Sequence, residues 1–255
     1  MAKAPPQIFS KGRKRARNRR ASAMRFEGEQ VPFLLDEMAQ DAHERLAFLR
    51  HEPSRVLVEG FDAGAISSGP WQTLPDITDI QQQDFDDPLP LSSATFDLVA
   101  TINSLDTVND LPGALIQIRE LLVPGGLAIA SFIGGASLGK LRRAMFDAEP
   151  DRPAARMHPL IDPRSCPQLL SRAGWSDSVV DSFPLTVRYG SLDRLVRDLR
   201  EHAMGSALAS PAPPLTHAGK KRAEQAFLDQ ADQDGKVSET FEIITLTGRR
   251  SLAGA

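Results

Sequence analysis

Apolar residues recur at steps of three and four over residues 31–49, which predicts an amphipathic helix with Pro32 in its first turn. The same spacing predicts a helix over 111–122, which the Pro124-Gly-Gly turn ends. Short runs that are almost entirely apolar predict buried strands over 55–59, 96–102 and 127–133. Further helices are predicted over 138–148, 165–173 and 192–203, and further strands over 178–187 and 241–247.

The order of these elements predicts the fold class. Strands alternate with helices through short glycine-bearing turns, and continuously apolar strands are typical of a parallel α/β sheet covered on both faces. The two late strands predict an antiparallel edge strand. Residues 61–83 are only 23 in number, too few for a complete pair of crossovers, so we expect the other edge of the sheet to be shortened. Ligands of such sheets bind at the carboxyl ends of the strands.

Composition narrows the class of protein. The 255 residues are 41% hydrophobic and 25% charged, which is ordinary for a soluble globular chain and excludes a disordered chain, a collagen and a membrane bundle. A single cysteine, Cys166, excludes an intrachain disulfide framework and makes a reducing cytoplasm the simplest location. The histidines show no metal-ligand spacing, so no metal site is predicted.

Charge divides the chain into two parts. Residues 1–26 carry a net charge of +9 and the remainder −12, for a total of −3. We therefore predict a basic N-terminal arm, 1–30, and an α/β domain, 31–255. Three interpretations of the arm remain open: a partly helical arm lying on the domain, an electrostatic contact with an acidic partner or nucleic acid, and a targeting peptide. Because no aromatic residues interleave the basic run, a protein partner is favoured and nucleic acid is unlikely.

Longer segments resemble a known family. The run FDLVATINSLDTVNDLPGALIQIRELLVPGGLAIASFIGG (96–135) resembles class I S-adenosylmethionine-dependent methyltransferases, which have a Rossmann-like sheet. The opening IFSKGRKRARNRRA and the later HPLIDPRSCPQLLSRAGW are similar to the branch containing malonyl-acyl-carrier-protein O-methyltransferases and a complex I assembly factor that hydroxylates arginine.

That resemblance implies two functions. The first is the transfer of a methyl group from S-adenosylmethionine to a carboxylate or protein substrate. The alternative is a catalytically degenerate assembly factor that binds a protein partner, such as a respiratory complex I subunit. Arginine hydroxylation follows from the resemblance alone, since the sequence has no two-histidine-plus-carboxylate iron motif. No catalytic residue is predicted, because methyl transfer depends mainly on positioning.

The family binds its cofactor with an acidic residue at the end of the first strand, followed by Gly-x-Gly-x-Gly. Here the matching residues are Glu59, Gly60 and Gly64, while Asp62 stands at the middle glycine position. Glu59 comes one residue later than the family's acid, which on a strand directs it to the opposite face from Val58. The loop is therefore degenerate, and the resemblance implies cofactor contacts at Glu59, Gly60 and Gly64.

Further cofactor contacts are implied downstream. Asp84 matches the acid that meets the adenine amino group, and Asn103 follows the strand over 96–102. Asp76 and Asp79 are the acids available to bind the ribose, but we favour solvated turn aspartates for both. Asp106 is either a ligand for a cationic group or the cap of the helix that begins near residue 111.

The polar loop over 156–164 is a candidate substrate insert. Arg156, His158, Asp162 and Arg164 could face a cleft. We favour the alternative, a polar loop whose side chains bond to one another. Cys166 has no evident histidine partner, so an inert thiol is expected.

Overall fold

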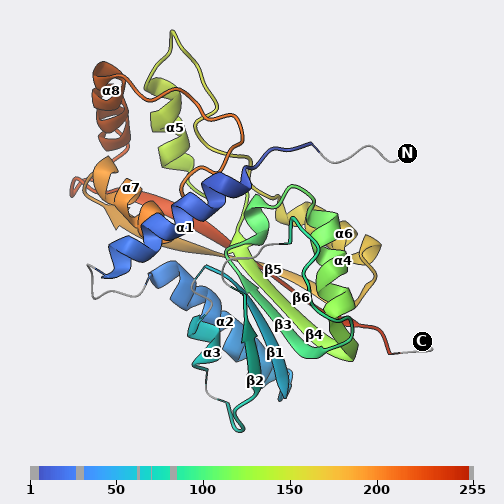
Figure 1. The fold of residues 1–255 in the computed structure, drawn as a ribbon. Coiled ribbons are helices and arrows are strands. Elements are labelled where there is room, and N and C mark those ends of the chain that lie inside the picture. The colour runs from blue at the N-terminus through green and yellow to red at the C-terminus, as the bar shows by residue number, and fades with distance from the viewer. Residues whose placement is uncertain (1–5, 27–31, 62–63, 70, 81–84, 253–255) are drawn as a thin grey trace.

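The computed structural model describes residues 6–26, 32–61, 64–69, 71–80 and 85–252, and these form a central sheet with helices around it (Figure 1). The strands are β1 (Arg55–Gly60), β2 (Asp76–Asp79), β3 (Phe96–Ile102), β4 (Leu122–Ile133), β5 (Trp175–Tyr189) and β6 (Val237–Arg250). Their order across the sheet is β2-β1-β3-β4-β6-β5. Asp84 lies outside the described residues.

Strand directions confirm the predicted α/β sheet. Strands β2, β1, β3 and β4 run parallel to one another, whereas β6 is antiparallel to both β4 and β5. The edge strand β5 is therefore paired antiparallel, as predicted. At the other edge β2 has only four residues, which confirms the predicted shortening.

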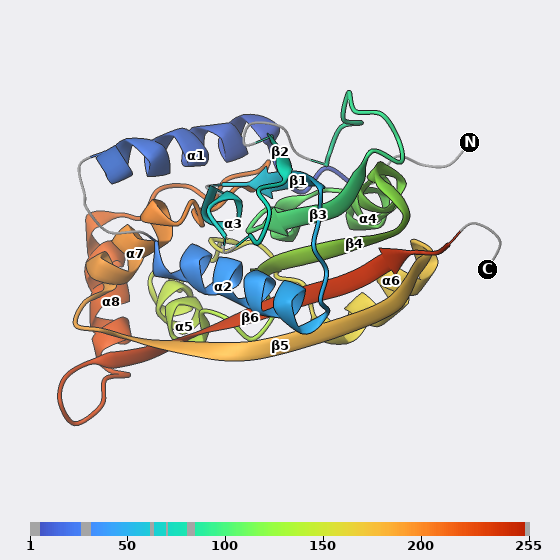
Figure 2. The ribbon, with the colours of Figure 1, turned by 90° about the horizontal axis from the view of Figure 1, so that it is seen from below.

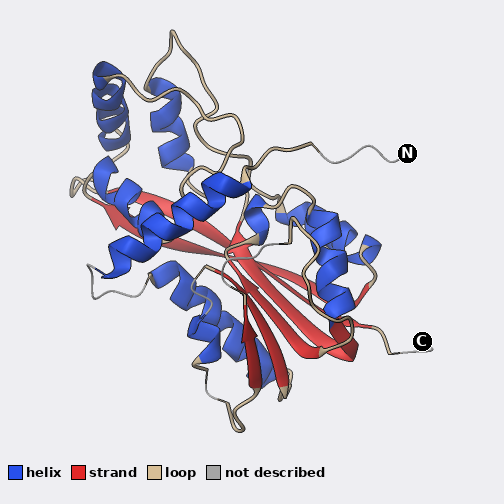
Figure 3. Cartoon of the chain, in the orientation of Figure 1, coloured by secondary structure: helices blue, strands red, loops and turns tan. Residues whose placement is uncertain are grey.

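Helices cover both faces of the sheet (Figure 3). They are α1 (Lys11–Phe26), α2 (Phe33–Phe48), α3 (Gly64–Ser67), α4 (Leu111–Leu121), α5 (Gly139–Asp147), α6 (Cys166–Arg172), α7 (Leu192–Glu201) and α8 (His217–Leu228), with 3-10 turns η1 (Leu105–Thr107) and η2 (Pro163–Ser165). Val56 and Val58 pack on the side of α2, and Leu57 packs on the side of α4. Alternate residues of β1 thus enter two cores, which is why its sequence is continuously apolar.

Helix α8 is absent from the elements that the sequence predicts. Its buried positions are Gly219, Ala223 and Phe227, a narrow stripe in which only one residue is large. Such a stripe produces little hydrophobic periodicity. The helix begins at a cap, in which Thr216 Oγ1 accepts a hydrogen bond from the Gly219 N–H at 2.9 Å.

The basic arm forms helix α1, which lies across α7 and the strand ends (Figure 2). Lys14 is buried and its Nζ lies 2.6 Å from Asp86 Oδ2 and 3.1 Å from the Thr107 carbonyl oxygen. Before the helix, the side-chain oxygen of Asn109 accepts hydrogen bonds from the N–H groups of Ile8 and Phe9, each at 2.8 Å. The structure thus has the first of the three arrangements that the sequence left open, an arm that packs on the rest of the chain.

None of the helices in the described part of the chain combines the length and the hydropathy that a bilayer crossing requires.

Candidate functional site

The parallel strands β1, β2 and β3 have their carboxyl ends at the same edge of the sheet, and each has a polar residue at or directly after that end. Glu59 and Gly60 close β1, Asp79 closes β2, and Asn103 comes directly after β3. Asp79 pairs in register with Val58, so the ends of β1 and β2 are adjacent. The structure therefore brings together Glu59, Asp79 and Asn103, which lie far apart in the sequence.

Internal hydrogen bonds engage Glu59 and Asn103. Glu59 is 2% exposed, and the Ser104 hydroxyl donates to its Oε2 at 2.5 Å. Asn103 is also buried and has a positive φ of 53°. Its Nδ2 donates to the His202 carbonyl oxygen at 2.9 Å, which ties the end of β3 to the residue after α7.

The two predicted glycines differ in what they require. Gly60 has φ +122°, and a Cβ there would lie 1.9 Å from the Ile102 carbonyl oxygen. Close packing of β1 on β3 therefore requires glycine at this position. At Gly64 a Cβ would meet nothing within 4 Å, so the space beside the start of α3 is open.

The assignment of Asp76 and Asp79 to a turn is wrong. Both lie in β2, Asp76 at its start and Asp79 at its carboxyl end. The sequence pattern did not predict this strand because Ile77 is its only large apolar residue. A partly exposed edge strand can form with so few apolar side chains.

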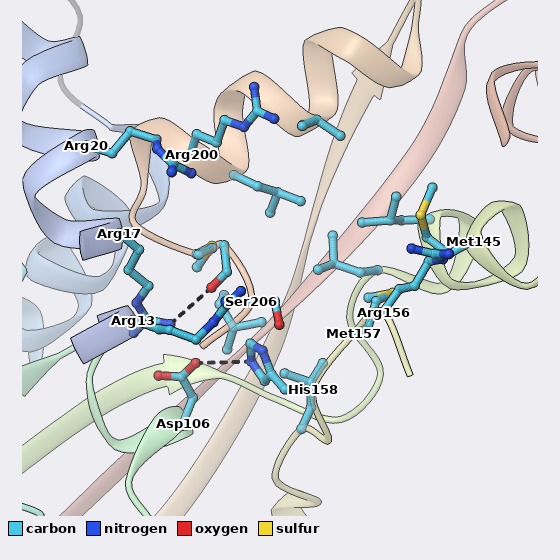
Figure 4. A pocket seen from close by; sticks show the side chains of 18 of the residues that line it. Arg13, Arg17, Arg20, Asp106, Met145, Arg156, Met157, His158, Arg200 and Ser206 are labelled. Carbon is cyan, nitrogen blue, oxygen red and sulfur yellow. Dashed lines mark hydrogen bonds and ion pairs between the residues drawn. The ribbon is translucent and has the colours of Figure 1, made fainter. Parts of the chain in front are cut away.

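A cavity of about 440 Å³ opens beneath α1, between α5, α7, η1 and the 156–160 loop (Figure 4). Its apolar lining comprises Ala16, Ile133, Leu138, Leu141, Met145, Met157, Leu160, Val196, Leu199 and Met204. Its charged and polar lining comprises Arg13, Arg17, Arg20, Asp106, Arg156, His158, Arg200 and Ser206.

Asp106 and His158 face each other in the cavity wall. They are 7% and 9% exposed, and His158 Nε2 lies 3.6 Å from Asp106 Oδ2, longer than a hydrogen bond. Among the described residues, neither Asp106 Oδ1 nor His158 Nε2 has a hydrogen-bond partner. Asp106 does not cap α4, because the side chain of Asp110 does so and accepts from the Gly113 N–H at 3.0 Å.

The remaining candidates of the 156–164 loop divide between cavity and surface. Arg156 lines the cavity but is bound to the carboxylate of Glu149 and, at 2.7 Å, to the Pro213 carbonyl oxygen. The Thr216 N–H and Arg152 hold the pKa of Glu149 at about 2. Asp162 and Arg164 pair with each other at 2.7 Å outside the cavity.

The cavity arginines of α1 were not singled out from the sequence. Arg13, Arg17 and Arg20 follow one another at steps of four and three, which places them on one face of the helix. That spacing does not distinguish them in the sequence, because most positions from 11 to 20 are basic and many pairs share it. Arg17 is fastened to the protein through the Thr107 hydroxyl at 2.9 Å and the Gly205 carbonyl oxygen at 3.4 Å.

Within the described ranges, no group of three or more His, Cys, Asp or Glu side chains is placed to hold a metal ion.

Cys166 is buried at the start of α6, and burial raises the pKa of its thiol from 9.0 to about 11. A rise of this size in the pKa lowers the thiolate population at pH 8 about a hundredfold relative to an exposed thiol, and the rate of alkylation falls with it because only the thiolate is nucleophilic. We expect iodoacetamide at pH 8 to alkylate the native protein at least about a hundredfold more slowly than the urea-unfolded protein, as measured by mass spectrometry. Equal rates in the two states would contradict this.

Comparison with known proteins identifies the class. A family model described as a methyltransferase domain matches residues 36–178, more than half of the chain, and the chain belongs to this family. The fold is that of a Rossmann-like class I methyltransferase: a protein named as a methyltransferase (BH2331) from Bacillus halodurans C-125 superposes with a TM-score of 0.50 at 13% identity, covering 82% of this chain and 98% of that one.

Curated relatives fall in the branch that the sequence segments resemble. The chain is 33% identical over 181 residues to human "Arginine-hydroxylase NDUFAF5, mitochondrial", covering 69% of this chain and 51% of the relative. It is 27% identical over 255 residues to the malonyl-[acyl-carrier protein] O-methyltransferase of Halorhodospira halophila, covering 88% and 83%. The chain thus spans about half the length of the arginine-hydroxylases that it matches. The predicted resemblance is confirmed, and the chain belongs to the methyltransferase domain family.

Proposed function

We propose that the chain binds S-adenosylmethionine at the carboxyl ends of β1, β2 and β3 and transfers its methyl group to a carboxylate or protein substrate in the cavity beneath α1. The observation that carries this proposal is the segment that joins the two places. Asn103 directly follows the carboxyl end of β3, and Asp106, three residues later, lines the cavity. A molecule at the strand ends and one in the cavity would therefore be neighbours.

The described residues at the strand ends suit this cofactor. Glu59 and Asp79 place two carboxylates at adjacent strand ends, where they can accept hydrogen bonds from hydroxyl or ammonium groups. The open space beside Gly64 leaves room at the first turn. When bound, S-adenosylmethionine supplies a methyl group on a positively charged sulfur, and the chain's part is to position the acceptor against it.

Calorimetric titration of the purified chain with S-adenosylmethionine and S-adenosylhomocysteine tests the proposal. We expect micromolar binding, weakened about tenfold or more by Asp79→Asn, because a hydrogen bond to a charged group contributes about 1.5–3 kcal/mol. Asp76→Asn is the matched control: it removes a carboxylate from the other end of the same strand and should leave binding unchanged. No heat and no thermal stabilisation at millimolar ligand would refute methyl transfer.

A second function is favoured by a specific observation. Glu59 and Asn103, two of the implied cofactor residues, already bond to Ser104 and His202 within the protein, and Asp62 stands at the middle glycine position. We propose, as the alternative, an assembly factor whose partner is a protein, with a respiratory complex I subunit as the class that the resemblance implies. Arg15 and Arg19 on the exposed face of α1 would contact an acidic partner. For either function the cytoplasm stays our proposed location.

A further inference from the structure

The cavity beneath α1 differs in chemistry from one end to the other. Arg20 and Arg200 stand at one end, and Asp106 with His158 at the opposite end (Figure 4). Arg20 and Arg200 are exposed, whereas Asp106 and His158 are buried, so the arginines mark the mouth and the Asp106–His158 pair the inner end.

At the mouth, guanidinium groups from two helices remain available to a ligand. Arg20 comes from α1 and Arg200 from α7, and within the described residues no hydrogen bond or ion pair engages either guanidinium group, whereas Arg13 lies nearer Ser206 and the Asp106–His158 end (Figure 4). Arg17 and Arg156, in contrast, are held by the protein itself. Guanidinium groups bind carboxylates with paired hydrogen bonds, so the mouth suits an organic anion.

Between the two ends the cavity wall is apolar. Ile133, Leu138 and Leu141 are buried and line it, together with Val196 and Leu199 of α7. Three methionines, Met145, Met157 and Met204, complete the lining with side chains that adapt to irregular ligands. A volume of about 440 Å³ is within the range of small-molecule sites. The middle of the ligand is therefore aliphatic.

The inner end of the cavity suits a ligand group that both donates and accepts hydrogen bonds. Asp106 Oδ1 is a buried acceptor and His158 Nε2 a buried ring nitrogen, and neither has a hydrogen-bond partner among the described residues. Buried polar atoms are normally hydrogen-bonded, so two unsatisfied atoms on facing side chains point to a missing ligand group. A second carboxylate would be repelled by Asp106, and an ammonium group would be disfavoured by the neighbouring Arg13 (Figure 4). A hydroxyl donates to the carboxylate and accepts from the imidazole.

We propose that the cavity binds an amphipathic hydroxy acid, with its carboxylate on Arg20 and Arg200, its aliphatic chain along the apolar wall and its hydroxyl between Asp106 and His158. This deepens the proposed function, on which it rests for the ligand being the substrate. The binding itself requires no methyl donor, so it is measured separately from cofactor binding.

Three probes of one chain length test each end of the cavity: 8-hydroxyoctanoate, octanoate and octane-1,8-diol. By calorimetry on the full chain we expect the hydroxy acid to bind about tenfold more tightly than either of the others. Equal affinity of octanoate and the hydroxy acid would overturn the role of the Asp106–His158 pair. Equal affinity of the diol would overturn the role of the arginines, and no saturable binding of any probe would overturn the proposal.

Variants assign each end to its residues. Asp106→Ala should abolish the advantage of the hydroxy acid over octanoate, and His158→Phe should do the same if the first variant does not fold. Arg200→Gln should abolish the advantage over the diol. Arg197→Gln is its matched control, because Arg197 lies on the same helix, bonds to Glu201 at 2.8 Å and does not line the cavity. If S-adenosylmethionine binds and the probes do not, only this inference fails; if the probes bind and S-adenosylmethionine does not, only the proposed function fails.

Discussion

Gly60→Ala should lower the free energy of unfolding by about 3 kcal/mol or more, because both the backbone conformation and the packing at this position exclude a side chain. The residue has φ +122°, and the new Cβ would lie 1.9 Å from the backbone oxygen of Ile102. Since Gly60 pairs with Ile102 in the sheet, the clash can be relieved only if β1 moves away from β3. Urea denaturation followed by circular dichroism measures the change.

Gly64→Ala is the matched control for that experiment. Gly64 occupies the other predicted cofactor glycine position, but a Cβ there meets nothing within 4 Å. Helix α3 begins at Gly64, and alanine has a higher helix propensity than glycine. We therefore expect the free energy of unfolding of the Gly64→Ala protein to be unchanged or slightly raised. If Gly60→Ala and Gly64→Ala lowered the free energy of unfolding by the same amount, the close approach of β1 to β3 would not be what requires glycine at position 60.

Lys14→Ala should lower the free energy of unfolding by about 3–5 kcal/mol, because it removes one half of a buried ion pair. The side chains of Lys14 and Asp86 are 7% and 3% exposed, and they meet at 2.6 Å. The substitution takes the Lys14 ammonium group away from the buried carboxylate of Asp86, which keeps its hydrogen bonds from Asn109, and it also removes the bond to the Thr107 carbonyl oxygen. Urea denaturation gives the energy, and faster proteolysis within α1 would show that the helix has been released.

Lys11→Ala on the same helix is the control. Lys11 pairs with Asp87 at 2.5 Å, but the side chains are 34% and 62% exposed, so water and salt screen the interaction. We expect little change in stability or in proteolysis of α1. If the two lysine variants behave alike, the buried pair is not the anchor of α1.

The anchoring of α1 bears on function because this helix contributes Arg13, Arg17 and Arg20 to the cavity. Release of α1 would remove those guanidinium groups together. Lys14→Ala should therefore also weaken 8-hydroxyoctanoate binding, although Lys14 does not line the cavity.

Local patterns predicted most of the fold. The apolar runs at β1, β3 and β4 are continuous because both faces of these strands are buried, and α2 and α4 show the helical period because one face of each enters a core. Strand β2 and helix α8 were not predicted, because an edge strand and a helix packed through small residues bury too few large apolar side chains to leave a pattern.

By itself, the sequence determined the α/β class, the shortened edge of the sheet, the methyltransferase family and the unusual loop around Gly60. These follow from periodicity, segment length and motifs that lie within a few residues of one another. Only the tertiary structure decided that Asp79 ends a strand beside Glu59, that Asp106 faces His158, and that α1 covers a cavity. Those contacts join residues tens of positions apart, and they form because parallel strands gather their carboxyl ends at one edge, where no local pattern records which side chains will meet.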